Sequence, residues 1–394
     1  MKTRQMTRRP LTRKTAALAA FVGLSALCAA APSLAATATQ GEFGKLADGA
    51  AIESVTLKNS HGLSARIITY GAMWQSMMVP DRNGKLADVI LGYDTIGEYV
   101  ARNQYSGMTV GRYANRIAKG QFTLDGKSYQ LAINNPPNAL HGGPTGFEVR
   151  VWKIVNVDKG GAGKPASVTL QYVSADGEEG YPGTMTTDVT YSLSDNDDLT
   201  IHYKAVTDKP TVVNLTNHAL FNLEGAASGH SALNATAQVE ADTYLPTDKT
   251  AIPTGDCVPV KGTAFDFTKP AVINGRAHDG KDPQVLIGTG IDHNFCLRGG
   301  ETKTPKLAVT LIDHQNGRGL KILTTEPGIQ FYSGNFLDGI TPGKGGVTTR
   351  QGDGVAFEAQ HFPDSPNHPD YPSTRLDPGQ TYTQTTVHHF FVAK

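Results

Sequence analysis

A two-residue alternation of apolar and polar side chains recurs along this 394-residue chain and limits its fold more than any other feature. It runs clearly through residues 168–172, 199–205 and 307–311. Such alternation is typical of β-strands with one buried and one solvated face. The spacing of an amphipathic helix is almost absent, and 43 Gly and 22 Pro leave little uninterrupted chain for long helices. The sequence therefore predicts an all-β protein.

Turn-forming pairs separate the predicted strands. Asn-Gly and Asp-Gly favour the positive φ of tight hairpins, and they occur at residues 83–84, 125–126, 176–177 and 316–317. We find no linker and no internal repeat, because the nearest linker candidate, a short Gly-rich run, lies between two strand-like segments and fits a hairpin tip. We therefore predict one large antiparallel β-sandwich domain over residues 36–394, with sites on a concave sheet face or on rim loops.

The first 35 residues have the pattern of an export signal. Six Lys or Arg residues precede an apolar stretch at 16–31, and Ser33, Leu34 and Ala35 offer small residues at cleavage positions. This pattern predicts a signal peptide over residues 1–35 and an exported protein of the bacterial periplasm or the extracellular space. Arg8 and Arg9 leave both the general secretory route and the twin-arginine route open.

The charge balance of residues 36–394 narrows the choice of partner. Removing residues 1–35 takes away six basic and no acidic residues, so 36 basic against 36 acidic residues becomes 30 against 36. A mildly acidic chain without a basic cluster argues against nucleic acid and anionic membranes as partners, and the apolar stretch is too short for a stable membrane anchor. A neutral small molecule fits better, and the oligomeric state is left open. Cys257 and Cys296 could form a disulfide, but we favour buried free thiols because Cys296 lies in an apolar run.

Several familiar sites lack support in the sequence. There is no GxGxxG after a strand, no GxxxxGK[ST] and no GxSxG. Asp195, Asp197 and Asp198 lack the spacing of a calcium loop and fit a solvated turn. His388 and His389 are neighbours on a probable strand, so their rings point to opposite faces and do not share a metal. Nothing in the sequence requires a metal ion.

Two ionisable residues lie in runs that should be buried. His218 precedes Leu220 and Phe221 in NLTNHALFNL, and Glu358 follows Phe357 in GVAFEAQHFPD. A buried charge is costly unless the site uses it, and an imidazole and a carboxylate kept out of bulk water are what proton transfer needs. A hydrogen-bonded core histidine and a structural carboxylate are the alternative interpretation.

A set of longer segments extends over nearly the whole chain after the leader. They are GRYANRIAKGQFTLDGKSYQL from Gly111, NALHGG from Asn138, DGEEGYPG from Asp176, NLTNHALFNL from Asn214, YLPTDKTAIPTG from Tyr244, GIDHNFCL from Gly290, TTEPGIQFYSGNFLDG from Thr324 and FEAQHFPD from Phe357. In these segments and in their order, the chain resembles the aldose 1-epimerase, or galactose mutarotase, family. The resemblance implies a β-supersandwich, interconversion of the α and β anomers of free sugars such as galactose or glucose, and no cofactor.

The resemblance also implies roles for individual residues. It places the base at Glu358 and the acid at His218, and the sugar contacts at Asn115, Arg116, His141, Asp292 and Gln330. The chemistry agrees, because opening a cyclic hemiacetal removes the proton of the anomeric hydroxyl while delivering a proton to the ring oxygen. A histidine and a carboxylate suffice near neutral pH. The plainer alternatives are a turn residue for Asp292, a turn histidine for His141 and a salt bridge within the sheet for Arg116.

The chain departs from the family pattern at several positions. Ala219 and Leu220 stand where Ser-Tyr is common, and Ala359 stands where Thr or Ser is common, so hydroxyl groups are lost and the sugar preference is open. Glu148 and Val149 replace a usual Asp-Lys, which we interpret as structural drift. A periplasmic sugar-binding module without catalysis and a glycoside hydrolase that pairs Asp292 with Glu358 are the alternative functions.

Overall fold

The computed structural model describes residues 35–394, which group into one compact unit. The predicted signal peptide, residues 1–35, thus lies outside the described residues except for Ala35. Among the described residues, no helix is long and apolar enough to cross a membrane.

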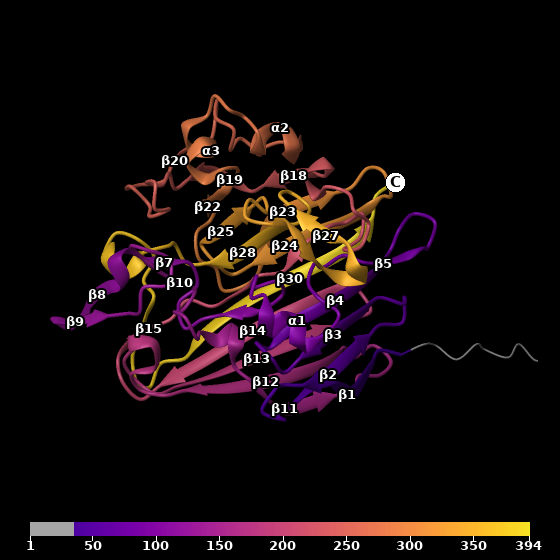
Figure 1. The fold of residues 1–394 in the computed structure, drawn as a ribbon, viewed down its shortest axis with the longest axis horizontal. Helices are drawn as coiled ribbons and strands as arrows, with labels where there is room; N and C mark the ends of the chain where they lie inside the picture. Colours follow the sequence, from indigo (N-terminus) through magenta and orange to yellow (C-terminus); the bar gives the residue numbers. More distant parts are fainter. Residues whose placement is uncertain (1–34) are drawn as a thin grey trace, which may run out of the picture. The chain divides into compact units, whose positions relative to one another are not determined.

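The largest sheet has nine antiparallel strands (Figure 1). In spatial order they are β11 (Lys153–Asp158), β12 (Ala166–Ser174), β13 (Met185–Leu193), β14 (Asp198–Thr207), β30 (Tyr382–Val392), β24 (Arg318–Thr324), β23 (Lys306–Ile312), β18 (Thr236–Val239) and β21 (Ala271–Val272). The C-terminal strand β30 lies between β14 and β24, so it joins the two halves of the sheet.

A six-stranded sheet faces this large sheet and carries the site described below. In spatial order its strands are β17 (Leu220–Phe221), β28 (Val355–Gln360), β25 (Gly328–Tyr332), β22 (Asp292–Leu297), β19 (Ala241–Tyr244) and β20 (Val258–Pro259). A third sheet consists of β1 (Thr37–Lys45), β2 (Ala51–Lys58), β3 (Ser64–Ile68), β4 (Met73–Pro80) and β5 (Leu86–Asp88). All strand pairs in these sheets are antiparallel, as the sequence predicts.

Short two-stranded ladders fill the connections between the sheets. They pair β6 (Thr109–Val110) with β16 (Thr216–Asn217), β7 (Arg116–Ile117) with β10 (Ala139–Leu140), β8 (Gln121–Leu124) with β9 (Lys127–Gln130), β15 (Thr211–Val212) with β29 (Arg375–Leu376), and β26 (Asp338–Pro342) with β27 (Thr348–Arg350). The β8–β9 hairpin turns at Asp125 and Gly126, whose φ angles of 52° and 75° are those that an Asp-Gly pair favours.

Helices are few and short, as the Gly and Pro content predicts. The described residues contain α1 (Ile96–Ala101), α2 (Ile273–Ala277) and α3 (Pro283–Gly288), together with 3₁₀ turns such as η2 (Phe147–Val149). Helix α1 begins with a capping box, in which the Thr95 side chain accepts from the Glu98 N–H and the Glu98 carboxylate accepts from the Thr95 N–H. These caps stabilise a helix that is too short to be stable on propensity alone.

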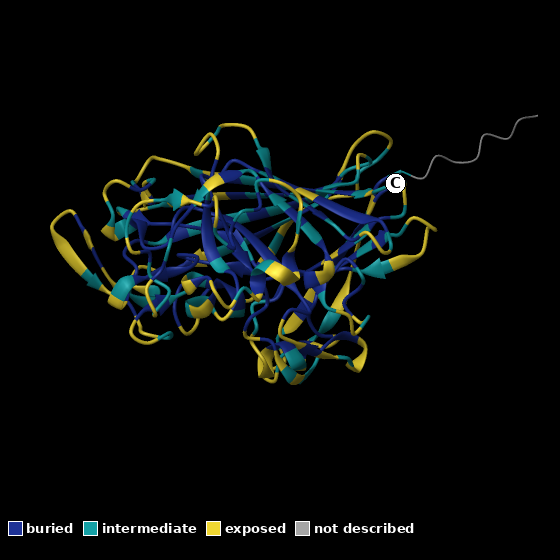
Figure 2. Ribbon diagram, turned by 90° about the horizontal axis from the view of Figure 1, so that it is seen from above, coloured by how far each residue is buried: buried dark blue, intermediate teal, exposed yellow. Residues whose placement is uncertain are grey.

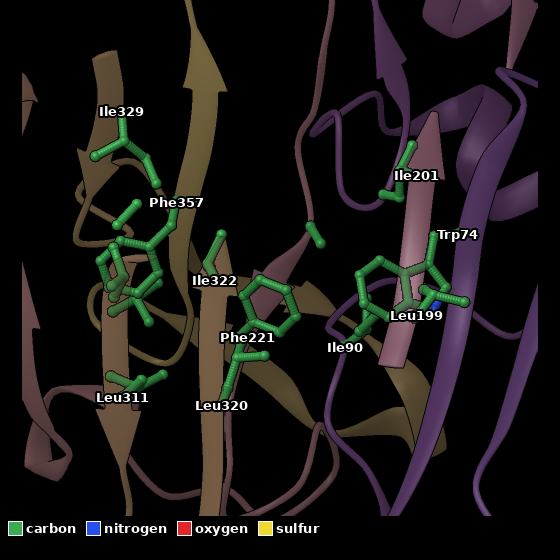
Figure 3. Packing of buried hydrophobic residues seen from close by; sticks show 14 of the residues in the cluster. Trp74, Ile90, Leu199, Ile201, Phe221, Leu311, Leu320, Ile322, Ile329 and Phe357 are labelled. Carbon is green, nitrogen blue, oxygen red and sulfur yellow. The ribbon is translucent and has the colours of Figure 1, made fainter. Parts of the chain in front are cut away.

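The core lies between the sheets. In β13 every second residue from Met185 to Leu193 is buried, and the residues between them are partly exposed, which is the alternation seen in the sequence. Buried residues concentrate along the strands, and exposed residues mainly occupy the loops (Figure 2). Ile322 of the nine-stranded sheet, Ile329 and Phe357 of the six-stranded sheet and Trp74 of β4 belong to one apolar cluster (Figure 3).

The two cysteines differ from the prediction of free thiols, because Cys257 and Cys296 form a disulfide. Strand alternation explains the difference. Phe295 and Leu297 point into the core, so Cys296 between them points to the other face, where it is only partly buried. The Cα atoms of the two cysteines are 6.5 Å apart, which is within the usual range for a disulfide. Cys296 therefore lies in an apolar run, but its own side chain points away from the core.

Candidate active site

Glu358 lies in the middle of β28, on the face opposite the core. Its neighbour Phe357 points into the apolar core (Figure 3). There it packs against Phe331 with ring centroids 4.5 Å apart. Because successive strand residues face opposite ways, the Glu358 carboxyl points to the outer side of the six-stranded sheet. There it is only 2% exposed, and Gln330 of β25 is its partner in the register.

His218 reaches the same place from a different part of the chain. It follows β16, and its backbone is fixed by hydrogen bonds from its N–H to the Met108 carbonyl and from the Gly107 N–H to its own carbonyl. The Nε2 atom of His218 lies 3.5 Å from Oε1 of Glu358. The fold therefore brings these two residues together from distant parts of the chain. The separation is long for a hydrogen bond, so both groups retain capacity to bond to a third molecule.

Burial sets the protonation of this pair. Removal from water lowers the pKa of His218 to about 4 and raises the pKa of Glu358 well above its usual value; the negative charge of Asp292 acts in the same direction on Glu358. Burial thus favours the uncharged form of each group, a protonated carboxyl at Glu358 and a neutral imidazole at His218.

His141 adds a second neutral imidazole. It follows β10, has a positive φ of 52°, and its Nδ1 accepts a hydrogen bond of 3.1 Å from the Asn115 N–H. Burial, together with the proximity of His218 and the positive charge of Arg116, lowers the pKa of His141. Since Nδ1 is the acceptor, the proton of the neutral ring is on Nε2, which makes His141 a hydrogen-bond donor.

Arg116 is held beside His141 by the short β7–β10 ladder, in which it pairs with Leu140. Its Nε donates to the Asn135 side chain, and its backbone N–H donates to Oδ1 of Asn115. Within residues 35–394 no hydrogen bond or salt bridge engages its two Nη atoms, so the structure does not support the alternative of a sheet salt bridge. Asn115 itself has a positive φ of 65°, a conformation that Asn tolerates better than most residues.

Asp292 and Gln330 form a hydrogen-bonded pair on neighbouring strands. Asp292 is the first residue of β22, and Nε2 of Gln330 donates to its Oδ1 at 2.7 Å. Asp292 lines the cavity described next, whereas Gln330 is 3% exposed and does not line it. The structure therefore places Gln330 where it orients Asp292, and direct contact between Gln330 and a sugar stays a prediction.

These side chains surround a cavity of about 260 Å³. That volume is below the range of roughly 300–1,000 Å³ for drug-sized ligands, so the cavity suits one small molecule. Its lining combines polar and ionisable residues with apolar and aromatic ones. The lining residues are Asn103, Gln104, Tyr105, Asn115, Arg116, Leu140, His141, His218, Leu220, Asp292, Tyr332, Phe336, Leu337 and Glu358.

Sequence reasoning missed the aromatic wall of this cavity. The Tyr105 ring lies 4.8 Å from the His141 ring and 5.9 Å from the His218 ring, and the Tyr332 ring lies 6.1 Å from His218, measured between centroids. Tyr332 lies in a segment that carries the family resemblance, so a signal for it existed. Tyr105 follows helix α1 in a loop without a recognisable motif, and only the fold brings it to the site.

One group of possible metal ligands occurs among residues 35–394. One ligand atom each from His141, His218 and Glu358 lies within 4.8 Å of the others. However, the hydrogen bond from Asn115 places the proton of His141 on Nε2, and a protonated nitrogen does not coordinate a metal. The two remaining ligands are fewer than a stable zinc site uses. The donor set therefore fits proton transfer better than metal binding.

Comparisons with known proteins agree with this geometry. The family model described as "Aldose 1-epimerase" matches residues 53–389. The galactose mutarotases of Sus scrofa and Homo sapiens are 43% and 42% identical to the chain over 90% and 91% of its length and 99% and 100% of their own. The aldose 1-epimerase of Escherichia coli is 37% identical over 87% of the chain and 96% of its own length. A galactose 1-epimerase structure from Lactobacillus acidophilus superposes with a TM-score of 0.79 at 29% identity, over 92% of the chain and 100% of its own.

The comparison corrects one prediction and settles the family. The prediction of export to the periplasm or the extracellular space is wrong, because the mammalian galactose mutarotases that match the chain are cytosolic. The leader-like residues 1–34 lie outside the described part of the structure. The match itself covers almost every described residue and includes the segments that carry His218 and Glu358. The chain belongs to the aldose 1-epimerase family.

Proposed function

We propose that this protein interconverts the α and β anomers of free hexoses such as galactose or glucose, and that His218 and Glu358 transfer the protons. The observation that carries the proposal is the approach of His218 Nε2 to within 3.5 Å of Glu358 Oε1 at the wall of a monosaccharide-sized cavity. Similarity to curated galactose mutarotases and aldose 1-epimerases supports an enzyme of the isomerase class.

Ring opening needs two proton transfers, one at each of the two oxygen atoms bonded to the anomeric carbon C1. Glu358, as the carboxylate, removes the proton of the anomeric hydroxyl, and His218, as the imidazolium, delivers a proton to the ring oxygen. The bond between C1 and the ring oxygen breaks while C1 becomes an aldehyde. After rotation about the C1–C2 bond, the two transfers run in reverse on the other face of the aldehyde. Each positioned transfer contributes roughly 10²- to 10⁴-fold to the rate.

The protonation that burial favours in the free protein differs from the one that starts ring opening. Burial favours a protonated Glu358 and a neutral His218, which is the state of the two residues when the sugar ring is open. The sugar must therefore shift the proton from Glu358 to His218 before its ring opens. The shift turns two neutral groups into a carboxylate and an imidazolium, so the net charge of the buried site stays the same and the two new charges lie side by side.

Three other residues can stabilise this exchange. His141 can donate from Nε2, and the Nη groups of Arg116 have no partner among residues 35–394. Both side chains can bond to a sugar oxygen that gains negative charge during ring opening. Asp292, oriented by Gln330, can accept hydrogen bonds from sugar hydroxyls. Leu220 lines the cavity at a position where tyrosine is common in the family. We therefore expect the preferred sugar to differ from that of other family members at the hydroxyl group that faces Leu220.

Polarimetry on freshly dissolved α-glucose and α-galactose tests the proposal. An epimerase accelerates the decay to the equilibrium rotation in proportion to its concentration. A sugar-binding module leaves the decay at its spontaneous rate, and a glycoside hydrolase instead releases reducing sugar from oligosaccharides. A decay that the protein does not change, across several aldoses, would refute the proposal.

A further inference from the structure

Glu148 is a buried carboxyl group next to the cavity, at a position that the sequence did not connect with it. It lies in η2 (Phe147–Val149) and has no exposed surface. A carboxyl group is rarely buried to this degree without a partner of opposite charge, and no salt bridge involves Glu148 among the described residues. Structural drift, which the sequence suggests for this position, does not account for so costly a burial.

The two oxygen atoms of Glu148 face different parts of the site. Oε1 accepts a hydrogen bond of 3.4 Å from the Asn103 side chain. Oε2 is buried without a partner and points toward the loop that carries His141. A Cβ atom at Gly146 would lie 2.5 Å from Glu148 Oε2, 2.7 Å from the His141 carbonyl oxygen and 2.9 Å from the Gly111 carbonyl oxygen. Only the absence of a side chain at Gly146 lets these three oxygens gather around one point.

An ionised carboxylate would be unfavourable in this place. Burial raises the pKa of Glu148 to about 8, and the two carbonyl oxygens near Oε2 can accept a hydrogen bond but cannot donate one. The charged and titratable groups that face Glu148 are Arg150, which lowers its pKa, Glu179, which raises it, and the phenols of Tyr70 and Tyr105. At neutral pH the carboxyl group is therefore mostly protonated and can donate from Oε2.

The Asn103 side connects Glu148 to the aromatic wall. Oδ1 of Asn103 accepts from the Tyr105 N–H at 3.1 Å, so the same amide links Glu148 to Tyr105. Tyr105 has a positive φ of 58°, a conformation that a tyrosine adopts only when its surroundings hold it. Its ring packs on both His141 and His218. A change at Glu148 would thus reach the two histidines through the wall segment Asn103–Tyr105.

We propose that Glu148 is a positioning residue of the epimerase reaction: as a neutral carboxylic acid it ties the wall segment Asn103–Tyr105 to the loop that carries His141. The inference rests on the proposed function, because it assigns Glu148 to the catalysis by His218 and Glu358. It also gives a physical role to Glu148, which stands where Asp is common in the family. The longer side chain of Glu reaches the Asn103 amide.

Two substitutions separate the proposed role from a structural one. Glu148→Gln keeps an acceptor for Asn103 and a donor toward the carbonyl oxygens, and it does not ionise. Glu148→Ala removes both. We expect Glu148→Gln to keep kcat/KM for α-galactose or α-glucose within about twofold of wild type at pH 7, and Glu148→Ala to lose about tenfold, the free-energy equivalent of one hydrogen bond to a neutral group. Glu224→Gln, a carboxyl-to-amide change beside the exposed His230, is the matched control and should change nothing.

The pH dependence of the activity distinguishes the proposed role of Glu148 from a purely structural one. The ratio of wild-type to Glu148→Gln activity cancels every titration that the two proteins share. It should be constant from pH 5 to 7 and fall by up to about tenfold by pH 9, as Glu148 ionises in the wild type alone. The wild-type to Glu224→Gln ratio should stay flat over the whole range.

The outcomes are distinct. If wild type does not accelerate mutarotation, the proposed function fails, whatever Glu148 does. If wild type is active but Glu148→Ala stays within twofold, or Glu148→Gln loses as much as Glu148→Ala, the positioning role is refuted. If Glu148→Ala does not fold, Asn103→Ala removes the same hydrogen bond from the other partner; a loss of activity with an unchanged melting temperature supports the proposal, and full activity overturns it.

Discussion

The two faces of strands β25 and β28 carry different kinds of side chain. On the inner face, Phe331 and Phe357 pack ring to ring in the core. On the outer face, one residue away along each strand, Gln330 and Glu358 pair in the register, and Glu358 lines the cavity. Alternation along a strand thus lets one segment supply both the stability of the fold and the chemistry of the site.

The two faces also contribute differently to stability. Burial of an aromatic side chain on the inner face is favourable, on the order of 1.5–3 kcal/mol. Glu358 of the outer face and the adjacent His218 carry buried polar atoms without partners among the described residues, namely Glu358 Oε2 and His218 Nδ1. Each such atom costs about 1–3 kcal/mol. The outer face is therefore built for a ligand that completes its hydrogen bonds, at the expense of the stability of the free protein.

The largest effect should come from removing a proton carrier on the outer face. Glu358→Gln or His218→Asn should lower the rate of mutarotation by about 10²- to 10⁴-fold. The free energy of unfolding should stay the same or rise, because a buried ionisable group is replaced by a neutral one. Polarimetry and urea unfolding measure the two quantities on the same sample. Rates near wild type in either variant would contradict the assignment of both residues.

An inner-face substitution should show the reverse pattern. Phe331→Ala leaves a cavity in the core and should lower the free energy of unfolding by about 3–5 kcal/mol. The fraction that remains folded should still catalyse, because Phe331 does not line the cavity. Phe336→Ala is the control, since Phe336 is 67% exposed at the cavity and its loss should change stability by less than about 0.5 kcal/mol. Equal destabilisation by both changes would remove the distinction between the faces.

Arg116→Ala probes the polar side of the site by itself. Loss of a positively charged donor should lower kcat/KM by about 10- to 10²-fold, with KM raised as well as kcat lowered, because Arg116 can bond to the sugar before and during ring opening. Initial rates at varied sugar concentration separate the two constants. A change in melting temperature with unaltered kinetics would assign Arg116 to the architecture of the β7–β10 ladder instead.

The smallest effect concerns acid pH. Because burial lowers the pKa of His218 from an ordinary value of 6.5 to about 4, the unfolded chain takes up a proton there before the folded protein does. Stability from the neutral imidazole is therefore present above pH 6.5 and is lost as the pH falls toward 4. Activity should hold from pH 7 to pH 5 and decline near pH 4, when the pair takes a second proton. A decline centred at pH 6.5 would show that His218 is not buried in solution.

The sequence carried enough information for the fold and for most of the site. Alternating residues such as Val189 and Tyr191 become inner-face residues of β13, and the Asp-Gly pair at 125 turns a hairpin. His218 and Glu358 were identifiable because a buried run with one ionisable residue is unusual, and the family resemblance pointed to Asn115, Arg116, His141 and Asp292, which line the same cavity. These features depend on residues that are neighbours in the sequence, so a strand pattern or a short motif predicts them.

The features that the sequence did not reveal depend on contacts between distant segments. Tyr105 and Glu148 reach the site only because η2 packs beside the loop after α1. The role of Gln330 behind Asp292 follows from the register of β22 and β25, which no motif encodes. The disulfide depends on which face of β22 carries Cys296. Pairing across strands and loops decides each case.

A double-mutant cycle on the His218–Glu358 pair, followed by polarimetry, is the decisive experiment on paired proton transfer. If the two residues act as a unit, Glu358→Gln and His218→Asn together should be no slower than the slower single variant, within about threefold. If the two losses multiply instead, so that the double variant is slower than either single one by a further 10²-fold or so, the residues act independently and the paired mechanism is refuted.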